Sequence, residues 1–207
     1  GTAGEAAGQQ DFADWIGRDL DQAFGQIAGA AVVDTLYFGG GTPSLLPVEA
    51  IARIVEEVNR LATIPSGAEI TLEANPESVT RDRLRGWREA GISRLSLGVQ
   101  SLSDEVLAPR GRLYTAKEAA ASARLVRQAG FDSVSFDLIA GLPGETVETF
   151  LDGTRALAAI DPDHISIYLL ELEESGKETP LARAVREGRS RPALEDETIT
   201  MFTSGMR

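Results

Sequence analysis

Five strand-like segments, each followed by a helical pattern, restrict the possible folds of this chain more than any other feature of its sequence. The segments begin near residues 33, 69, 94, 133 and 164. Strands that alternate with helices pair in parallel, because a parallel connection has to cross the sheet and the helix makes that crossover. The sequence therefore predicts an α/β fold built from consecutive βα units.

Residues with capping roles mark the ends of the predicted helices. Asp11, Thr80 and Thr115 precede helical patterns and are predicted N-caps. Thr115 and Glu118 have the spacing of a capping box, and Pro47 is predicted to be the first residue of its helix. These signals separate helices from strands and support the βα alternation.

The βα units are predicted to form a partial TIM barrel. A helix precedes the first predicted strand, so we expect a further strand upstream, with five of six βα units present in this chain. A flavodoxin-like sheet fits less well, because polar residues follow too many of the strands. We divide the chain into a polar linker or disordered start (1–10), the barrel (11–175) and a helical link toward a further domain (176–207).

Glycine or polar residues follow the predicted strands at their C-terminal ends. In a βα barrel these ends meet at one mouth, where active sites are built. Three consecutive glycines, Gly39 to Gly41, follow the first predicted strand. One glycine suffices for a turn, so the other two are predicted to keep side chains away from a ligand. The residues that form the predicted site are Gly39, Gly40, Gly41, Thr42, Glu73, Gln100 and Asp137.

Each of these residues also has a structural interpretation. Glu73 can cap the next helix, Gln100 can bond to neighbouring backbone, and Asp137 can have a structural role. For each residue considered alone, we favour the structural interpretation. Considered together and beside a glycine loop, the three residues favour a ligand site. The loop lacks the lysine of a Walker motif and the spacing of a dinucleotide fingerprint. Carboxylates and an amide suit a ligand with amine and hydroxyl donors.

The composition excludes several classes of function. With 32 acidic and 20 basic residues, the net charge of -12 disfavours nucleic acid and anionic membranes as partners. No apolar run is long enough to span a membrane, so a cytoplasmic protein is expected. The chain has no cysteine and one histidine, so no disulfide, thiolate ligand or histidine-based metal site is predicted, and no metal-binding residue is assigned.

Five segments resemble a known family in order and spacing. They are "LYFGGGTPSLL", "EITLEANPES", "RLSLGVQS", "GFDSVSFDLIAGLPGET" and "DHISIYLLELEE". Together they resemble radical S-adenosylmethionine (SAM) proteins of the oxygen-independent coproporphyrinogen III oxidase family, which includes a haem-chaperone branch. The match runs from about residue 33 to residue 201, and the combination is specific although each piece alone is not.

The resemblance implies a partial (β/α)6 barrel of the radical SAM type, with SAM and a [4Fe-4S] cluster at its mouth. It implies that Gly39, Gly40 and Gly41 place backbone against the amine and carboxylate of SAM, with Thr42 beside them. It implies that Glu73 accepts hydrogen bonds from the cofactor. Gln100, Arg112 and Asp137 are implied to line the same pocket. In the oxidase branch some of these residues contact a second SAM, so the resemblance leaves open which SAM each one serves.

One feature departs from the family. Its cluster is held by a CxxxCxxC loop, and this chain has no cysteine. We therefore expect that loop to lie upstream of residue 1, and we expect the chain alone to be inactive as a radical enzyme.

Within the family, the segment "YLLELEESGKETPLARAVREGR" favours the haem-chaperone branch, with haem or porphyrin as ligand and a haem-acceptor protein as partner. The first alternative is a true coproporphyrinogen III dehydrogenase, which oxidatively decarboxylates propionates. A second alternative, from a different class, is a non-catalytic barrel that only binds a ligand. An ordinary barrel aldolase is disfavoured, because no lysine follows a predicted strand to form a Schiff base.

Overall fold

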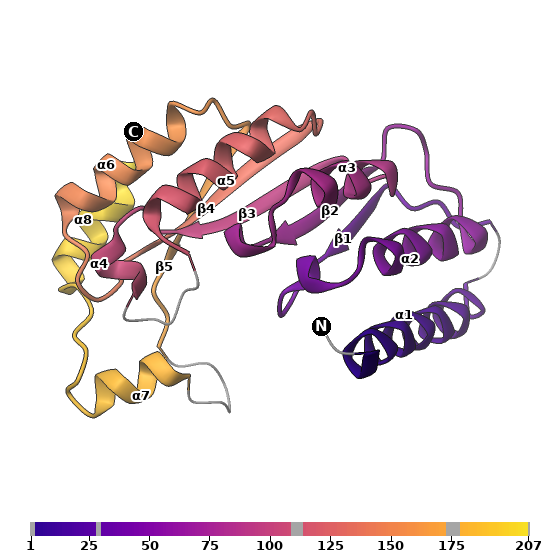
Figure 1. Ribbon diagram of the computed structural model, residues 1–207, viewed down its shortest axis with the longest axis horizontal. Coiled ribbons are helices and arrows are strands. Elements are labelled where there is room, and N and C mark those ends of the chain that lie inside the picture. Colours follow the sequence, from indigo (N-terminus) through magenta and orange to yellow (C-terminus); the bar gives the residue numbers. More distant parts are fainter. Residues whose placement is uncertain (1–2, 28–29, 109–113, 173–178, 207) are drawn as a thin grey trace.

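The sheet has five parallel strands in the order in which they occur in the chain. The computed structural model describes residues 3–27, 30–108, 114–172 and 179–206 (Figure 1). The strands pair as β1-β2-β3-β4-β5, each with its neighbour in sequence. Their bounds are β1 Thr35–Phe38, β2 Glu69–Ala74, β3 Arg94–Gln100, β4 Ser133–Ala140 and β5 His164–Leu169. The predicted α/β fold of consecutive βα units is confirmed.

The helices lie mainly against one face of this curved sheet (Figure 1). The α-helices are α1 Ala3–Phe24, α2 Val48–Leu61, α3 Arg81–Glu89, α4 Asp104–Leu107, α5 Ala116–Gln128, α6 Val147–Ala158, α7 Pro180–Arg186 and α8 Glu195–Gly205. Two short 3-10 helices, η1 Pro43–Leu45 and η2 Pro76–Ser78, follow β1 and β2. In the described part of the chain, none of these helices is both long enough and apolar enough to cross a membrane.

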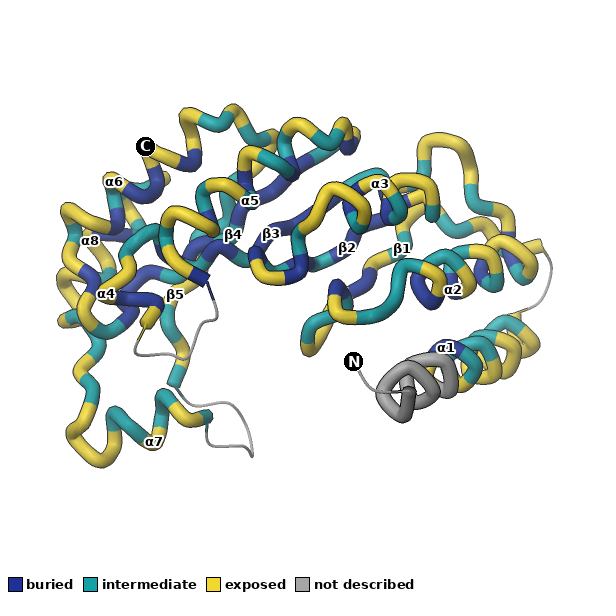
Figure 2. The backbone as a smooth tube through the Cα atoms, viewed as in Figure 1, coloured by how far each residue is buried: buried dark blue, intermediate teal, exposed yellow. Residues whose placement is uncertain are grey.

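The two faces of the sheet differ in polarity. In the central strands β2, β3 and β4, the side chains that point toward the helices are apolar and buried, among them Leu72, Leu95 and Phe136. Side chains at alternate positions point to the other face and include Glu73 and Asp137. A parallel sheet covered on both faces has nearly continuous apolar strands, and this sheet has alternating ones. Helices therefore cover one face, and Figure 2 shows the buried residues gathered along the strands and on the helix sides that meet them.

Two of the predicted N-caps are confirmed. The Thr80 hydroxyl accepts a hydrogen bond from the Arg83 amide at 3.2 Å. Thr115 and Glu118 form the predicted capping box: each accepts a hydrogen bond from the other's amide, at 3.2 and 2.8 Å. The prediction for Pro47 was wrong by one residue, because Pro47 is the N-cap and Val48 begins the helix.

The first helix begins earlier than predicted. Helix α1 starts at Ala3, so the N-cap prediction for Asp11 was wrong, and residues 3–10 of the predicted linker or disordered start are helical. This segment contains three alanines, two glutamines and one glutamate, whose helix propensity outweighs the cost of its two glycines. Helix α1 packs on α2, where Arg53 pairs with Asp14. The division near residue 175 stays a prediction.

The capping box gives a direct test of local stability. Thr115→Ala removes the side chain that caps α5, and we expect it to lower the free energy of unfolding by about 1 kcal/mol. Chemical denaturation followed by circular dichroism measures this loss. Lys117→Ala, in the same first turn, is the control and is expected to change stability by less than about 0.5 kcal/mol. Equal effects of the two substitutions would contradict the capping role.

Candidate functional site

A cavity of about 370 Å³ opens at the C-terminal ends of the strands. Its wall includes five of the eight predicted residues: Gly41, Thr42, Glu73, Gln100 and Asp137. Asn75, Ser96, Gly98, Tyr168 and Glu171 also line it. Arg112 lies outside the described residues. Because the strands are parallel and in register, residues from all five βα units meet here.

The three positions in the loop after β1 require glycine for different physical reasons. Gly40 and Gly41 have φ angles of 77° and 54°, which side chains disfavour, and a Cβ atom at either would meet nothing within 4 Å. A Cβ atom at Gly39 would lie 2.5 Å from the ring of Tyr37. Backbone geometry therefore requires the second and third glycines, whereas the first makes room for an aromatic side chain of the protein itself.

Gly39 and Gly40 also border a second, more apolar cavity of about 460 Å³ between α1 and β1. Its other walls include Phe12, Ile16 and Leu36. Tyr37 lines this second cavity, and its hydroxyl reaches the carboxylate of Glu73 in the wall of the first. The glycine loop thus lies between a cavity lined mainly by apolar side chains and a cavity whose lining includes the carboxylates of Glu73 and Asp137.

Glu73 is held by two donors from the first βα unit. The Tyr37 hydroxyl donates to Oε1 at 2.6 Å, and the Gly40 amide donates to Oε2 at 3.3 Å. Helix α3 is capped by Thr80 instead, so Glu73 does not serve as the cap of that helix. Since an ionised carboxylate can accept about four hydrogen bonds, each oxygen keeps capacity for a donor from a ligand.

Tyr37 was missed by the sequence analysis. Partial burial, the hydrogen bond to Glu73 and the negative charges of Glu73 and Asp137 raise the pKa of Tyr37 to about 12. The hydroxyl therefore remains a donor at pH values at which an ordinary tyrosine is ionised. Strand alternation was the available signal, because it places Tyr37 and Glu73 on the same face of neighbouring strands.

Asp137 is oriented by two serines on the concave face. The Ser96 hydroxyl donates to Oδ2 at 2.7 Å, and the Ser135 hydroxyl lies 3.4 Å from Oδ1. Ser96 and Ser135 are direct partners in the β3–β4 register. These serines were also missed, because serine within a strand carries no distinctive pattern until the register is known.

Gln100 reaches the cavity through an irregularity in β3. The β3–β4 register shifts between Gly98 and Gln100, and Gln100 has a φ angle of 67°. A bulge at a strand end re-aims the side chain that follows it. The asparagine of the preceding unit packs close by, since a Cβ atom at Gly98 would lie 3.1 Å from the Asn75 Oδ1 atom.

The described residues do not provide a metal centre. They contain no group of three histidine, cysteine or acidic side chains that could hold a metal ion. The whole sequence has no cysteine, and an iron–sulfur cluster is held by thiolates. The residues of this chain therefore fit a polar organic ligand and do not fit such a cluster.

Comparison with known proteins identifies the family. The family model of the Radical SAM superfamily matches residues 18–157, more than half of the chain. The chain belongs to the radical SAM superfamily. The matched region of this radical SAM chain contains the glycine loop, Glu73, Gln100 and Asp137.

Two relatives narrow the position within the superfamily. The heme chaperone HemW of Haemophilus influenzae is 38% identical over 168 residues, covering 80% of this chain and 44% of that protein. The mitochondrial radical S-adenosyl methionine domain-containing protein 1 of Bos taurus is 37% identical over 181 residues, covering 87% of this chain and 40% of that protein. The chain thus spans less than half the length of these relatives.

A solved structure agrees with the fold. The coproporphyrinogen III oxidase HemN from Escherichia coli, described as a radical SAM enzyme, superposes with a TM-score of 0.81 at 25% identity. The match covers 96% of this chain and 45% of that one. The partial barrel of the radical SAM type, implied by the sequence resemblance, is confirmed.

The Tyr37–Glu73 hydrogen bond predicts an abnormal tyrosine titration. At about pH 10.5 an ordinary phenol is about three quarters ionised, and we expect Tyr37 to stay protonated. The difference in tyrosinate absorbance between the native chain and Tyr37→Phe measures this. Because the folded pKa is raised, the hydrogen bond stabilises the fold fully below about pH 10 and is lost as the pH rises toward about 12.

Glu73→Gln supplies the control for that titration. It removes the charge and weakens the hydrogen bond, so the pKa of Tyr37 should fall toward its ordinary value without reaching it, since burial remains. An unchanged titration in Glu73→Gln would show that Glu73 does not perturb Tyr37. Circular dichroism at the same pH checks that each variant stays folded.

Proposed function

We propose that the cavity at the strand ends binds SAM and that Glu73 is its principal contact in this chain. The observation that carries the proposal is the arrangement of Glu73. Its carboxylate is fixed at the cavity wall by Tyr37 and Gly40, beside backbone that is open to a ligand because Gly40 and Gly41 have no side chains. A fixed anion beside exposed peptide groups suits the cationic amine and the carboxylate of an amino acid.

The remaining lining residues complement the rest of the same ligand. Asp137 accepts hydrogen bonds, and Gln100 and Thr42 both donate and accept, which suits amine and hydroxyl groups. The sequence resemblance to the family adds Arg112 as a proposed partner for the carboxylate of SAM. Bound SAM supplies a sulfonium-linked adenosyl group; the residues of this chain bind and orient it.

We also propose that the whole protein belongs to the haem-chaperone branch, binding haem and transferring it to an acceptor protein. Support comes from the relatives named HemW, at 38% identity in Haemophilus influenzae and 37% in Escherichia coli. The cluster ligands of such a protein are thiolates, which residues 1–207 do not contain. The proposed role of this chain is therefore the binding of SAM at the barrel mouth.

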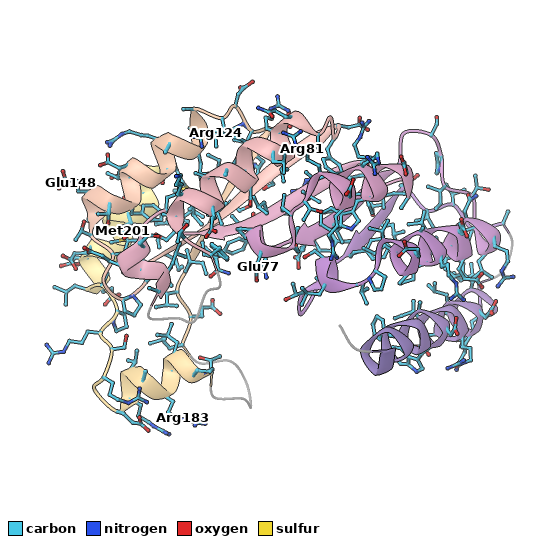
Figure 3. The ribbon with its side chains drawn as sticks, in the orientation of Figure 1. Glu77, Arg81, Arg124, Glu148, Arg183 and Met201 are labelled. Carbon is cyan, nitrogen blue, oxygen red and sulfur yellow. The ribbon has the colours of Figure 1, made fainter. Side chains whose placement is uncertain are left out.

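Replacement of Glu73 tests the SAM site. Glu73→Gln should weaken SAM binding by about 1–3 kcal/mol, because a charged hydrogen bond to the amine is lost. Isothermal titration calorimetry of the native and variant chains with SAM measures the difference. Glu77→Gln is the matched control, because Glu77 lies on η2 (Figure 3), is exposed and does not line the cavity.

Two results would contradict this site. Equal SAM affinity in the native chain and Glu73→Gln would remove Glu73 from the site. Equal losses in Glu73→Gln and Glu77→Gln would indicate a general charge effect instead of a specific contact.

The second candidate function is oxidative decarboxylation of coproporphyrinogen III. It is favoured by the structural likeness to HemN, which superposes on 96% of this chain with a TM-score of 0.81. We expect the full-length gene product, reconstituted anaerobically with iron and sulfide, to shift the Soret absorbance of added haem and to release no carbon dioxide from coproporphyrinogen III. Carbon dioxide release without haem binding would reverse the order of the two candidates.

A further inference from the structure

The far end of the glycine loop is held by helix α3, which lies outside the cavity. The Arg83 guanidinium donates through Nη2 to the backbone carbonyls of Ser44 and Leu46, the latter at 2.8 Å. These carbonyls lie within and just after η1, where a short helix leaves carbonyl groups without partners of its own. A cation that donates to two carbonyls satisfies them together and joins the loop to α3.

Arg83 is itself held in place. Its guanidinium carbon lies 5.3 Å from the centroid of the Trp87 ring, and Trp87 is fully buried. Leu84 and the Thr80 cap anchor the same helix. Arg83 is partly buried, and burial lowers its pKa, although a guanidinium stays charged at any physiological pH. The Arg83 guanidinium, which binds the loop carbonyls, therefore projects from a helix that is itself held in place.

A second contact reinforces the first. The Ser78 hydroxyl lies 2.9 Å from the hydroxyl of Ser44, and both side chains are buried. Ser78 belongs to η2, which connects β2 to α3. Both contacts thus run from the second βα unit to residues 44–46 of the first.

The loop needs an anchor at this end because of its glycines. Its first end is fixed where Phe38 pairs with Leu72 of β2. Gly39, Gly40 and Gly41 follow, and glycine loses more conformational freedom on ordering than any other residue. Without a fixed far end, the Gly40 amide that meets Glu73 would sample many positions.

We propose that Arg83 is a positioning residue for the ligand site: it fixes residues 44–46 from outside the barrel, so that the glycine loop is ordered before a ligand arrives. Preordering of this kind raises affinity by reducing the entropy lost on binding. The consequence for SAM rests on the proposed function, whereas the ordering of the loop does not.

Hydrogen exchange tests the ordering directly. In Arg83→Met we expect the amides of Leu45 and Leu46, which bond to Thr42 and Pro43, to exchange about tenfold faster or more. Arg85→Met is the matched control: Arg85 lies on the same helix, is exposed and pairs with Asp82 and Glu89, so loop exchange should not change. Arg83→Lys keeps the charge and places three N–H donors on a single nitrogen, so it should restore part of the protection.

Titration with SAM on the same variants tests the consequence. We expect SAM affinity to fall about fivefold to tenfold in Arg83→Met and to stay unchanged in Arg85→Met. Faster exchange spread evenly over all elements would show a general loss of stability and overturn the proposal, as would unchanged exchange at residues 42–46. If Arg83→Met does not fold, the same readouts on Arg83→Lys decide the matter.

The two proposals fail in different ways. If the native chain does not bind SAM, the proposed function fails and the exchange data still decide whether Arg83 orders the loop. If the native chain binds SAM and the loop loosens in Arg83→Met without loss of affinity, positioning of the ligand site by Arg83 is refuted while SAM binding stands.

Discussion

The parallel register of β1 to β5 is the constraint on which the rest of this structure depends. Because each strand pairs with its neighbour in sequence and points the same way, every C-terminal end reaches the same edge of the sheet. Glu73, Ser96 and Asp137 belong to three different strands and line one cavity for this reason. The alternation of side chains then separates an apolar face, packed under helices, from a polar concave face.

Two carboxylates stand on that concave face, and each is oriented by hydroxyl donors from a neighbouring strand. Tyr37 donates to Glu73, and Ser96 donates to Asp137. Hydroxyl donors occupy only part of the hydrogen-bonding capacity of each carboxylate, so both keep capacity for donors from a ligand. This distinguishes the site from the surface ion pairs of the molecule, such as Arg85 with Asp82, in which the carboxylate meets a cation.

Much of the candidate site was predictable, and the missing parts share a cause. Glycine triplets and polar residues after strands are visible in the sequence, and Glu73, Gln100 and Asp137 were named from them. Tyr37, Ser96 and Arg83 were not, because nothing in their local sequence marks them. Each acts through a partner 36 to 41 residues away, and which residues meet at that separation depends on register and on side-chain direction.

The sequence by itself determined the order of βα units, the caps at Thr80 and Thr115, and the glycine loop, because these depend on local periodicity and on backbone preferences. It misjudged the start of the first helix, where helix propensity prevailed over a polar, glycine-containing composition. Only the tertiary structure decided why each glycine is needed, which side chains orient the two carboxylates, and that α3 holds the loop. Those properties arise from contacts between units, and such contacts exist only once the strands are in register.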